Sequence, residues 1–241
     1  MAQLLRDQFS TLLTQVAIFE GFSLEELQQY SDKAIGKSYT KKQIVYLQDE
    51  KAEWAYVIQR GWVKLFRETL DGDEAVVDIL TTGQIFGDTA IFNDGCYACS
   101  SEVVEDAVIY QIPLSVLNAH ITTNNKLALN MLHNMSYFRK KQTRELEHMK
   151  VQNAPQRIGC FLLQLYKPRT GPSALIHLPY DKILIAARLG MQPETFSRAL
   201  LKLQHETGIR IQGATVEIDD ISVLTDYSCS SCSSTHPSAE C

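Results

Sequence analysis

The 241-residue chain lacks several features that define common protein classes. No apolar run reaches about 18 residues, so we expect no helix that spans a membrane. The N-terminal segment carries Arg6 and Asp7 and has no small-residue cleavage site of a signal peptide, so we expect a cytoplasmic protein. The net charge of −5 argues against a protein that coats nucleic acid indiscriminately, although a local basic surface can still bind DNA.

The sequence also lacks a recognisable catalytic arrangement. It shows no nucleophile–base pairing, no phosphate-binding loop and no carboxylate pair of defined geometry, so we do not expect an enzyme. The six cysteines are expected to be reduced, because the chain carries no export signal. Cys96 and Cys99 form a C-x-x-C pair that could act as thiols or as half a metal site, but we favour half-buried small residues.

A β-rich region extends from about residue 35 to residue 112. Its short strand segments are QIVYL, WAYVIQ, WVKLF, AVVDIL and AVIYQI, and the turn signals RG, DGD, TG and DG separate them. Regular short strands with turn signals between them predict an antiparallel sandwich or barrel.

A long helix is predicted over residues 122–152, which contain neither glycine nor proline. Its apolar residues recur mostly at steps of three and four: Leu127, Met131, Met135, Phe138, Leu146 and Met149. Such a stripe can pack on the β-rich domain of its own chain or on a second copy of the helix. We favour a homodimer, because the stripe is longer than one small domain can cover.

The C-terminal region carries the spacing of a helix-turn-helix. Ala186 is small where the first helix must approach the second, and Gly190, four residues later, suits the turn. Pro193 fits the first turn of the second helix. Phe196, six residues after Gly190, is apolar and is expected to lock the two helices together. The hairpin GIRIQGATVEI that follows is expected to form a wing that contacts the DNA backbone.

The second helix of this motif is the candidate recognition helix. Its core face is predicted to hold Phe196, Ala199, Leu200 and Leu203, which leaves the opposite face for DNA. Arginine can donate twice to guanine, glutamate can accept from cytosine, and serine can serve a base or a phosphate. The candidate DNA-binding residues are Glu194, Thr195, Ser197, Arg198 and Lys202.

Glu194 would weaken attraction to phosphates, so its presence calls for a specific reason. We interpret it as a base-reading residue that can pair with Arg198, four residues on, in the free protein. The alternative is a carboxylate that only stabilises the helix N-terminus through the macrodipole.

The β-rich domain, long helix and winged helix-turn-helix with E-T-F-S-R together resemble the cAMP receptor protein/fumarate–nitrate regulator (Crp/Fnr) family of bacterial transcription factors, over residues 16–226. Glu194, Ser197 and Arg198 resemble the fumarate–nitrate branch, which implies a TTGAT-like half-site. The stretch LPYDKILIAARLGMQPETFSR resembles regulators of nitrate respiration and nitric oxide.

The resemblance implies an α+β fold in four parts. An antiparallel β-roll, which is a jelly roll like that of cyclic-nucleotide-binding domains, would form the sensor with its helices over residues 1–121. The dimerisation helix would occupy residues 122–152 and the winged helix-turn-helix residues 153–227, followed by a Cys/Ser-rich tail, 228–241. The expected partners are double-stranded DNA, a second copy of the chain and RNA polymerase. A nucleotide-binding module without DNA-binding function is the alternative.

The sensor cassette, residues 86–102, is not expected to bind cAMP. Asp88 stands where the family has glutamate, and Ala98 and Cys99 stand where it has the phosphate-binding arginine and serine. No lysine or arginine lies between Arg67 and Lys126. A cyclic phosphate needs a cation or several focused N–H donors, so we expect a redox, gas or metal-linked signal instead.

The tail offers a different sensor. Cys229, Cys232 and Cys241 form C-x2-C-x8-C, with His236 between them, and such cysteines can bind zinc or an iron–sulfur cluster. The tail resembles a Bacillus-type variant of the fumarate–nitrate branch, which implies a cluster held by C-terminal cysteines. The alternative is a disordered Ser-rich tail with incidental or redox-reactive thiols.

A third possible sensor is haem, as in nitric oxide and carbon monoxide sensors of the family. His120, His133 and His148 are the candidate axial ligands, and no spacing singles one of them out.

Overall fold

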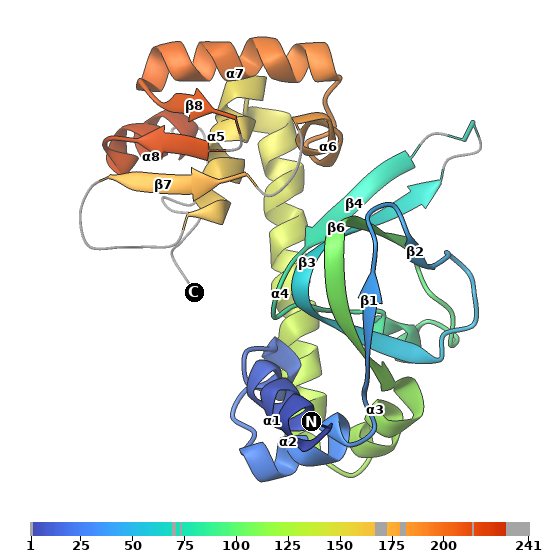
Figure 1. Cartoon of the computed structure of the whole chain (residues 1–241). Coiled ribbons are helices and arrows are strands. Elements are labelled where there is room, and N and C mark those ends of the chain that lie inside the picture. Colours follow the sequence, from blue (N-terminus) through green and yellow to red (C-terminus); the bar gives the residue numbers. More distant parts are fainter. Residues whose placement is uncertain are drawn as a thin grey trace. The chain divides into compact units, whose positions relative to one another are not determined.

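The structure is a computed structural model that describes residues 2–68, 71–72, 74–166, 173–178, 182–213 and 215–229 (Figure 1). The chain divides into two compact units, Met1–Phe138 and Arg139–Cys241. The long helix α4, Asn125–Val151, has residues in both. Among the described helices, none has the length and apolar character that crossing a bilayer requires.

The N-terminal unit is built on an antiparallel sheet with strand order β1-β6-β3-β4; β2 pairs with β6 and β5 with β3. This is the expected β-roll, and its long central strands bury one continuous core. The strands are β1 Ile35–Tyr39, β2 Ile44–Tyr46, β3 Trp54–Glu68, β4 Glu74–Leu80, β5 Ile85–Phe86 and β6 Ser100–Pro113.

Strand β3 corrects one prediction, because the RG signal at Arg60 and Gly61 does not separate two strands. β3 continues through it as one strand, and its register against β6 shifts around Arg60 and Trp62. Gly61 has a φ of +97°, which favours glycine, so here the residue supports a bulge rather than a hairpin turn.

The helices of this unit are α1 Ala2–Leu13, η1 Ala17–Phe19, α2 Leu24–Ser31, η2 Asp88–Phe92 and α3 Leu114–Ile121. Helix α2 begins with a capping box: the Ser23 hydroxyl accepts from the backbone N–H of Glu26, whose carboxylate accepts from the backbone N–H of Ser23. Phe9 stacks on Tyr110 of β6, with ring centroids 4.0 Å apart. The N-terminal helices therefore share the core of the sheet.

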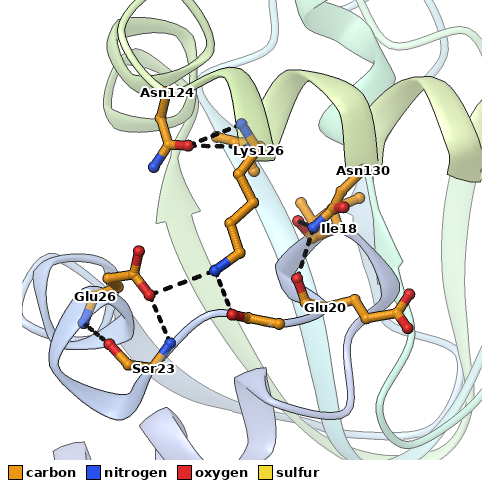
Figure 2. A network of polar contacts seen from close by, with 9 residues as sticks. Ile18, Glu20, Ser23, Glu26, Asn124, Lys126 and Asn130 are labelled. Carbon is orange, nitrogen blue, oxygen red and sulfur yellow. Dashed lines mark hydrogen bonds and ion pairs between the residues drawn. The ribbon is translucent and has the colours of Figure 1, made fainter.

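Helix α4 starts at Asn125 rather than at residue 122. The Asn124 side chain accepts from the backbone N–H groups of Lys126 and Leu127, at 3.0 and 3.3 Å, and so caps the helix. Figure 2 shows how the start of α4 holds the preceding N-terminal loop. Lys126 donates to the Gly21 carbonyl, and Asn130 donates to the carbonyls of Ile18 and Glu20, at 3.1 and 2.9 Å.

The apolar stripe of α4 has two parts. Leu127 and Met131 are buried in the core of the N-terminal unit. Met135, Leu146 and Met149 are 44%, 60% and 59% exposed. Packing among the described residues therefore buries the start of the stripe and leaves these three side chains exposed.

The C-terminal unit contains α5 Ala154–Leu165, β7 Ala174–His177, α6 Lys182–Arg188, α7 Pro193–Thr207, β8 Arg210–Gln212, β9 Thr215–Ile218 and α8 Ile221–Cys229. Its strands form a sheet in the order β7-β9-β8. Helix α5 packs against α7 and α8. Helix α8 was not predicted from the sequence. Cys229, which was assigned above to the tail, is the last residue of this helix.

Candidate nucleic-acid interface

The helix-turn-helix has the geometry that its spacing predicted. Gly190 sits in the turn with a φ of +60°, and its backbone N–H donates to the carbonyl of Ala187 at 3.0 Å. The N–H of Met191 reaches the carbonyl of Ala186 at 2.9 Å and closes the turn. Ala186 is fully buried, so the two helices approach closely at this point. Pro193 is in the first turn of α7, as expected.

Helix α7 has one buried and one exposed face. The predicted core residues are confirmed: Phe196, Ala199, Leu200 and Leu203 are all at most 6% exposed. All five candidate DNA-binding residues are exposed: Glu194, Thr195, Ser197, Arg198 and Lys202. The helix is therefore held rigidly from one side while its other side is free to enter a groove.

The exposed side chains are not arranged entirely as expected. Among the ion pairs of the described residues, none joins Glu194 to Arg198, so this structure does not contain the pairing that their spacing allows. An exposed pair four residues apart on a helix contributes only about 0.3–0.5 kcal/mol, comparable to thermal energy. The Ser197 hydroxyl donates to the Pro193 carbonyl at 2.9 Å, which leaves its oxygen able to accept.

The hairpin β8–β9 turns at Gly213, which has a φ of +60°, as expected for the wing. The guanidinium of Arg210, a basic residue of this hairpin, forms hydrogen bonds with two carboxylates. It donates to both oxygens of Asp219 at 2.7 Å and to Glu217 at 3.3 Å. The hydrogen bonds from Arg210 hold the pKa of Asp219 below its usual value. The described wing therefore presents little free positive charge to a phosphate.

The sensor cassette lies beside two basic residues of strand β3, Lys64 and Arg67, although both precede it in the sequence. Strand β3 pairs with β6 so that Lys64 stands opposite Glu102 and Phe66 opposite Ser100. Lys64 is buried and pairs with Glu74 and, at 3.4 Å, with Glu102. The absence of lysine and arginine between Arg67 and Lys126 could not reveal this neighbour, because strand pairing brings together segments that are far apart in the chain.

The cysteines of the cassette are half-buried free thiols, as expected. Burial raises the pKa of Cys99, and the nearby Arg67 guanidinium offsets only part of this effect. A protonated thiol is a poor nucleophile and a poor metal ligand. Among the described residues, no group of three His, Cys, Asp or Glu side chains could hold a metal ion.

Asp88 is the buried carboxyl of the cassette, 5% exposed at the start of η2. Burial raises its pKa to about 6, although the backbone N–H groups of Asp88 and Thr89 hydrogen-bond to the carboxyl. A carboxyl with a raised pKa in the folded state stabilises the fold at low pH and loses this contribution as pH rises through about 6.

Replacing Asp88 with asparagine is therefore expected to stabilise the N-terminal unit above pH 6. An amide keeps the accepting oxygen and removes the charge, so the gain should reach about 2–3 kcal/mol at pH 7.5. Urea unfolding from pH 4 to pH 8, followed by the fluorescence of Trp54 and Trp62, measures the difference. The free energies of unfolding of the parent and the variant should converge near pH 4. A difference between them that stays constant from pH 4 to pH 8 would contradict this account.

The remaining candidates for a sensor site are the C-terminal cysteines and three histidines. Cys232, Cys241 and His236 lie outside the described residues, as does the side chain of Cys229. His120 lies on α3, edge-on to the Tyr30 ring at 5.0 Å, and its Nδ1 is buried.

His133 and His148 lie on different turns of α4. Burial lowers the pKa of His148.

Comparisons with known proteins agree with both units. The profile of the cyclic nucleotide-binding domain matches residues 36–124, and that of the Crp-like helix-turn-helix domain matches residues 156–227. The anaerobic regulatory protein of Pasteurella multocida is 24% identical over 195 residues, 80% of this chain and 71% of that protein. The cyclic AMP receptor protein of Thermus thermophilus is 25% identical over 213 residues, 87% of this chain and 95% of that protein.

Similarity to a solved structure extends over nearly the whole chain. A proposed cyclic nucleotide binding protein from Ruegeria pomeroyi is 32% identical, with a TM-score of 0.66. The alignment covers 95% of this chain and 99% of that one. Together with the β-roll, the long helix and the helix-turn-helix described above, this places the chain in the Crp/Fnr family of DNA-binding transcriptional regulators.

Proposed function

We propose that the protein is a homodimeric transcriptional regulator that reads a TTGAT-like palindrome. The observation that carries this proposal is the exposed face of α7. It presents Glu194, Ser197 and Arg198 on a helix whose opposite face is buried. Specific recognition needs side chains held in a fixed register over the major groove, and this arrangement supplies them.

Each of the three side chains has a chemically distinct use. Arg198 can donate twice to O6 and N7 of a guanine, and Glu194 can accept from N4 of a cytosine. Guanine and cytosine pair with each other in DNA. Because Glu194 and Arg198 lie one helical turn apart, they can contact the two bases of a C·G pair or of its immediate neighbourhood. Ser197 can accept from a base or donate to a phosphate after it releases the Pro193 carbonyl. Glu194 therefore contributes to base preference rather than to affinity.

The exposed part of α4 supports a homodimer. Leu132 and Met135 are 61% and 44% exposed, and Leu146 and Met149 continue the same stripe. These positions follow the alternating three- and four-residue steps of a coiled coil, with Arg139 and Gln142 at the two intervening steps. A two-fold dimer matches a palindromic site. Sedimentation equilibrium at micromolar concentration tests this, and a monomer would contradict it.

The proposed signal is redox, gas or metal-linked rather than cAMP. Ala98 and Cys99 supply no cation at the phosphate-binding positions, and the charge of Lys64 is balanced by two glutamates. A further cation near Cys99 is Arg67, but its side chain is exposed and is not buried in the cassette. Calorimetric titration with cAMP tests this part of the proposal, and binding in the micromolar range would contradict it.

The C-terminal cysteines Cys229, Cys232 and Cys241 are proposed as ligands of an iron–sulfur cluster, with haem as the alternative cofactor. The test is an absorption spectrum, with iron and sulfide analysis, of protein purified without oxygen. Iron and sulfide with an air-sensitive visible band would support a cluster, and a sharp band that carbon monoxide shifts would support haem. A colourless, metal-free protein would contradict both.

Replacing Arg198 with alanine tests the DNA-binding proposal. Loss of a bidentate contact to guanine should weaken binding to a TTGAT palindrome by about 1–3 kcal/mol, roughly 5- to 150-fold, and relax the preference at one base position. Fluorescence anisotropy with palindromic and randomised duplexes measures both effects.

The matched control is Lys202→Ala, which removes the same charge from the same exposed face. Loss of a phosphate contact should weaken binding equally for all sequences and reduce the salt dependence by about one counterion. Equal losses on palindromic and randomised DNA for both variants would show that Arg198 does not read a base.

A further inference from the structure

The turn of the helix-turn-helix is fastened to two other helices of the C-terminal unit. Arg188, the last residue of α6, forms an ion pair with Glu145 of α4, with Nη2 and Oε1 2.5 Å apart. The next residue, Leu189, accepts a hydrogen bond on its carbonyl from the guanidinium of Arg157 on α5. The end of α6 at Arg188 and the first turn residue, Leu189, are therefore held by side chains of α4 and α5, which lie 43 and 32 positions earlier in the chain.

This junction is shielded from water. The side chains of Arg188 and Glu145 are 14% and 29% exposed, far less than those of a typical surface pair. Burial lowers the pKa of Arg157 and of His148, which lies close enough to Glu145 and Arg157 for their charges to affect it. A charge in such a place is costly to leave without its partner, so the geometry of the pair is tightly defined.

The turn transmits the position of Arg188 to the recognition helix. Backbone N–H groups of Leu189 and Met191 donate to the carbonyls of Ile185 and Ala186, at 3.0 and 2.9 Å, so the turn has little freedom. Helix α7 begins at Pro193, two residues after Met191. A shift of the Arg188 end of α6 therefore moves the start of α7, where Glu194 lies.

We propose that Glu145 and Arg188 are positioning residues for DNA recognition: their ion pair fixes the recognition helix α7 relative to α4. This inference rests on the proposed function of α7. Neither residue belongs to the exposed face of α7, so the pair acts through the turn rather than through the DNA. Because α4 also carries the exposed apolar stripe, the pair connects the proposed dimer helix with the helix that reads bases.

The sharpest test is Glu145→Gln, because electrostatics and positioning predict opposite results. Removing a negative charge from the DNA-binding unit should by itself strengthen attraction to DNA. If Glu145 positions the turn, its loss should instead weaken binding to the palindrome about tenfold. Binding to randomised duplexes should be equal to or slightly stronger than that of the parent. The melting temperature of the C-terminal unit should also fall by several degrees, because the variant removes a partly buried charge contact of Arg188; binding is therefore compared at a temperature where both proteins are folded.

Two further variants control the experiment. Glu206→Gln removes an exposed carboxylate from the far end of α7 and should leave the preference for the palindrome unchanged. The double exchange Glu145→Arg with Arg188→Glu restores an ion pair of opposite orientation and should recover most of the lost affinity.

The outcomes separate the inference from the function on which it rests. A parent protein that binds palindromic and randomised DNA equally would contradict the proposed function and the inference together. A parent that discriminates while Glu145→Gln binds the palindrome as tightly overturns the inference alone. A variant that loses melting temperature and both affinities in proportion also overturns it, because the pair would then stabilise the unit without positioning α7.

Discussion

Replacing Gly61 with alanine is expected to lower the free energy of unfolding of the N-terminal unit by about 3–5 kcal/mol, the sum of backbone strain and overpacking. Gly61 has a φ of +97°, a conformation that alanine adopts only with strain. An added Cβ would also lie 2.7 Å from the Cα of Ala107 and from the backbone oxygen of Asp106, both on β6. These are backbone atoms of the central strand, so no side-chain rotation can relieve the clash.

Gly72→Ala is the matched control. Gly72 has a φ of +83°, and its added Cβ would meet nothing within 4 Å, so this variant shows the conformational strain without the clash. Its expected cost is about 1 kcal/mol. Urea unfolding of both variants can be followed by Trp54 and Trp62, which lie on β3 of the same unit. Equal losses of stability would show that β6 moves to accommodate the extra methyl group.

The same glycine shows why part of the β-roll could not be predicted from the sequence. The alternation of apolar residues identified the strands, because it depends only on which face each residue occupies. Whether Gly61 ends a strand or bends it depends on the partner strand. Here β6 runs alongside β3 on both sides of the bulge. Strand pairing of this kind is not local in sequence, so the turn signal was misread.

The helix-turn-helix could be predicted almost completely, because its determinants lie close together in sequence. Ala186, Gly190 and Phe196 act through contacts between two adjacent helices and the turn that joins them. Helix α8 was missed for the opposite reason. Its sequence is rich in β-branched residues, and its position depends on packing against α5, where Ser228 lies against Gly159.

Charge interactions between distant segments were also beyond the sequence. The composition showed an acidic chain, but pairing of β3 with β6 placed Lys64 beside Glu102. The junction of Glu145 with Arg188 depends on how α4 and α6 pack, and no local pattern marks either residue. Sequence spacing identified the exposed face of α7 that is proposed to face DNA, whereas the contacts that hold this face in place emerge only from the fold.

The core of the DNA-binding unit should be most sensitive at Phe196. This side chain is 2% exposed and packs between α7 and the rest of the unit. Replacing it with alanine should cost about 3–5 kcal/mol. Because the two units have separate cores, the loss should be confined to the C-terminal unit. Circular dichroism should show an early helical transition, while the fluorescence of Trp54 and Trp62 reports an unchanged N-terminal unit.

Leu201→Ala is the control on the same helix, since its side chain is 67% exposed. Removing an exposed apolar side chain should change stability by no more than about 0.5 kcal/mol. Phe196→Ala should therefore lose DNA binding on warming well before Leu201→Ala does. If Phe196→Ala instead shifted the tryptophan transition as much as the helical one, the two units would unfold as one. In that case, the destabilised DNA-binding core would also weaken the sensor unit, because α4 has residues in both units.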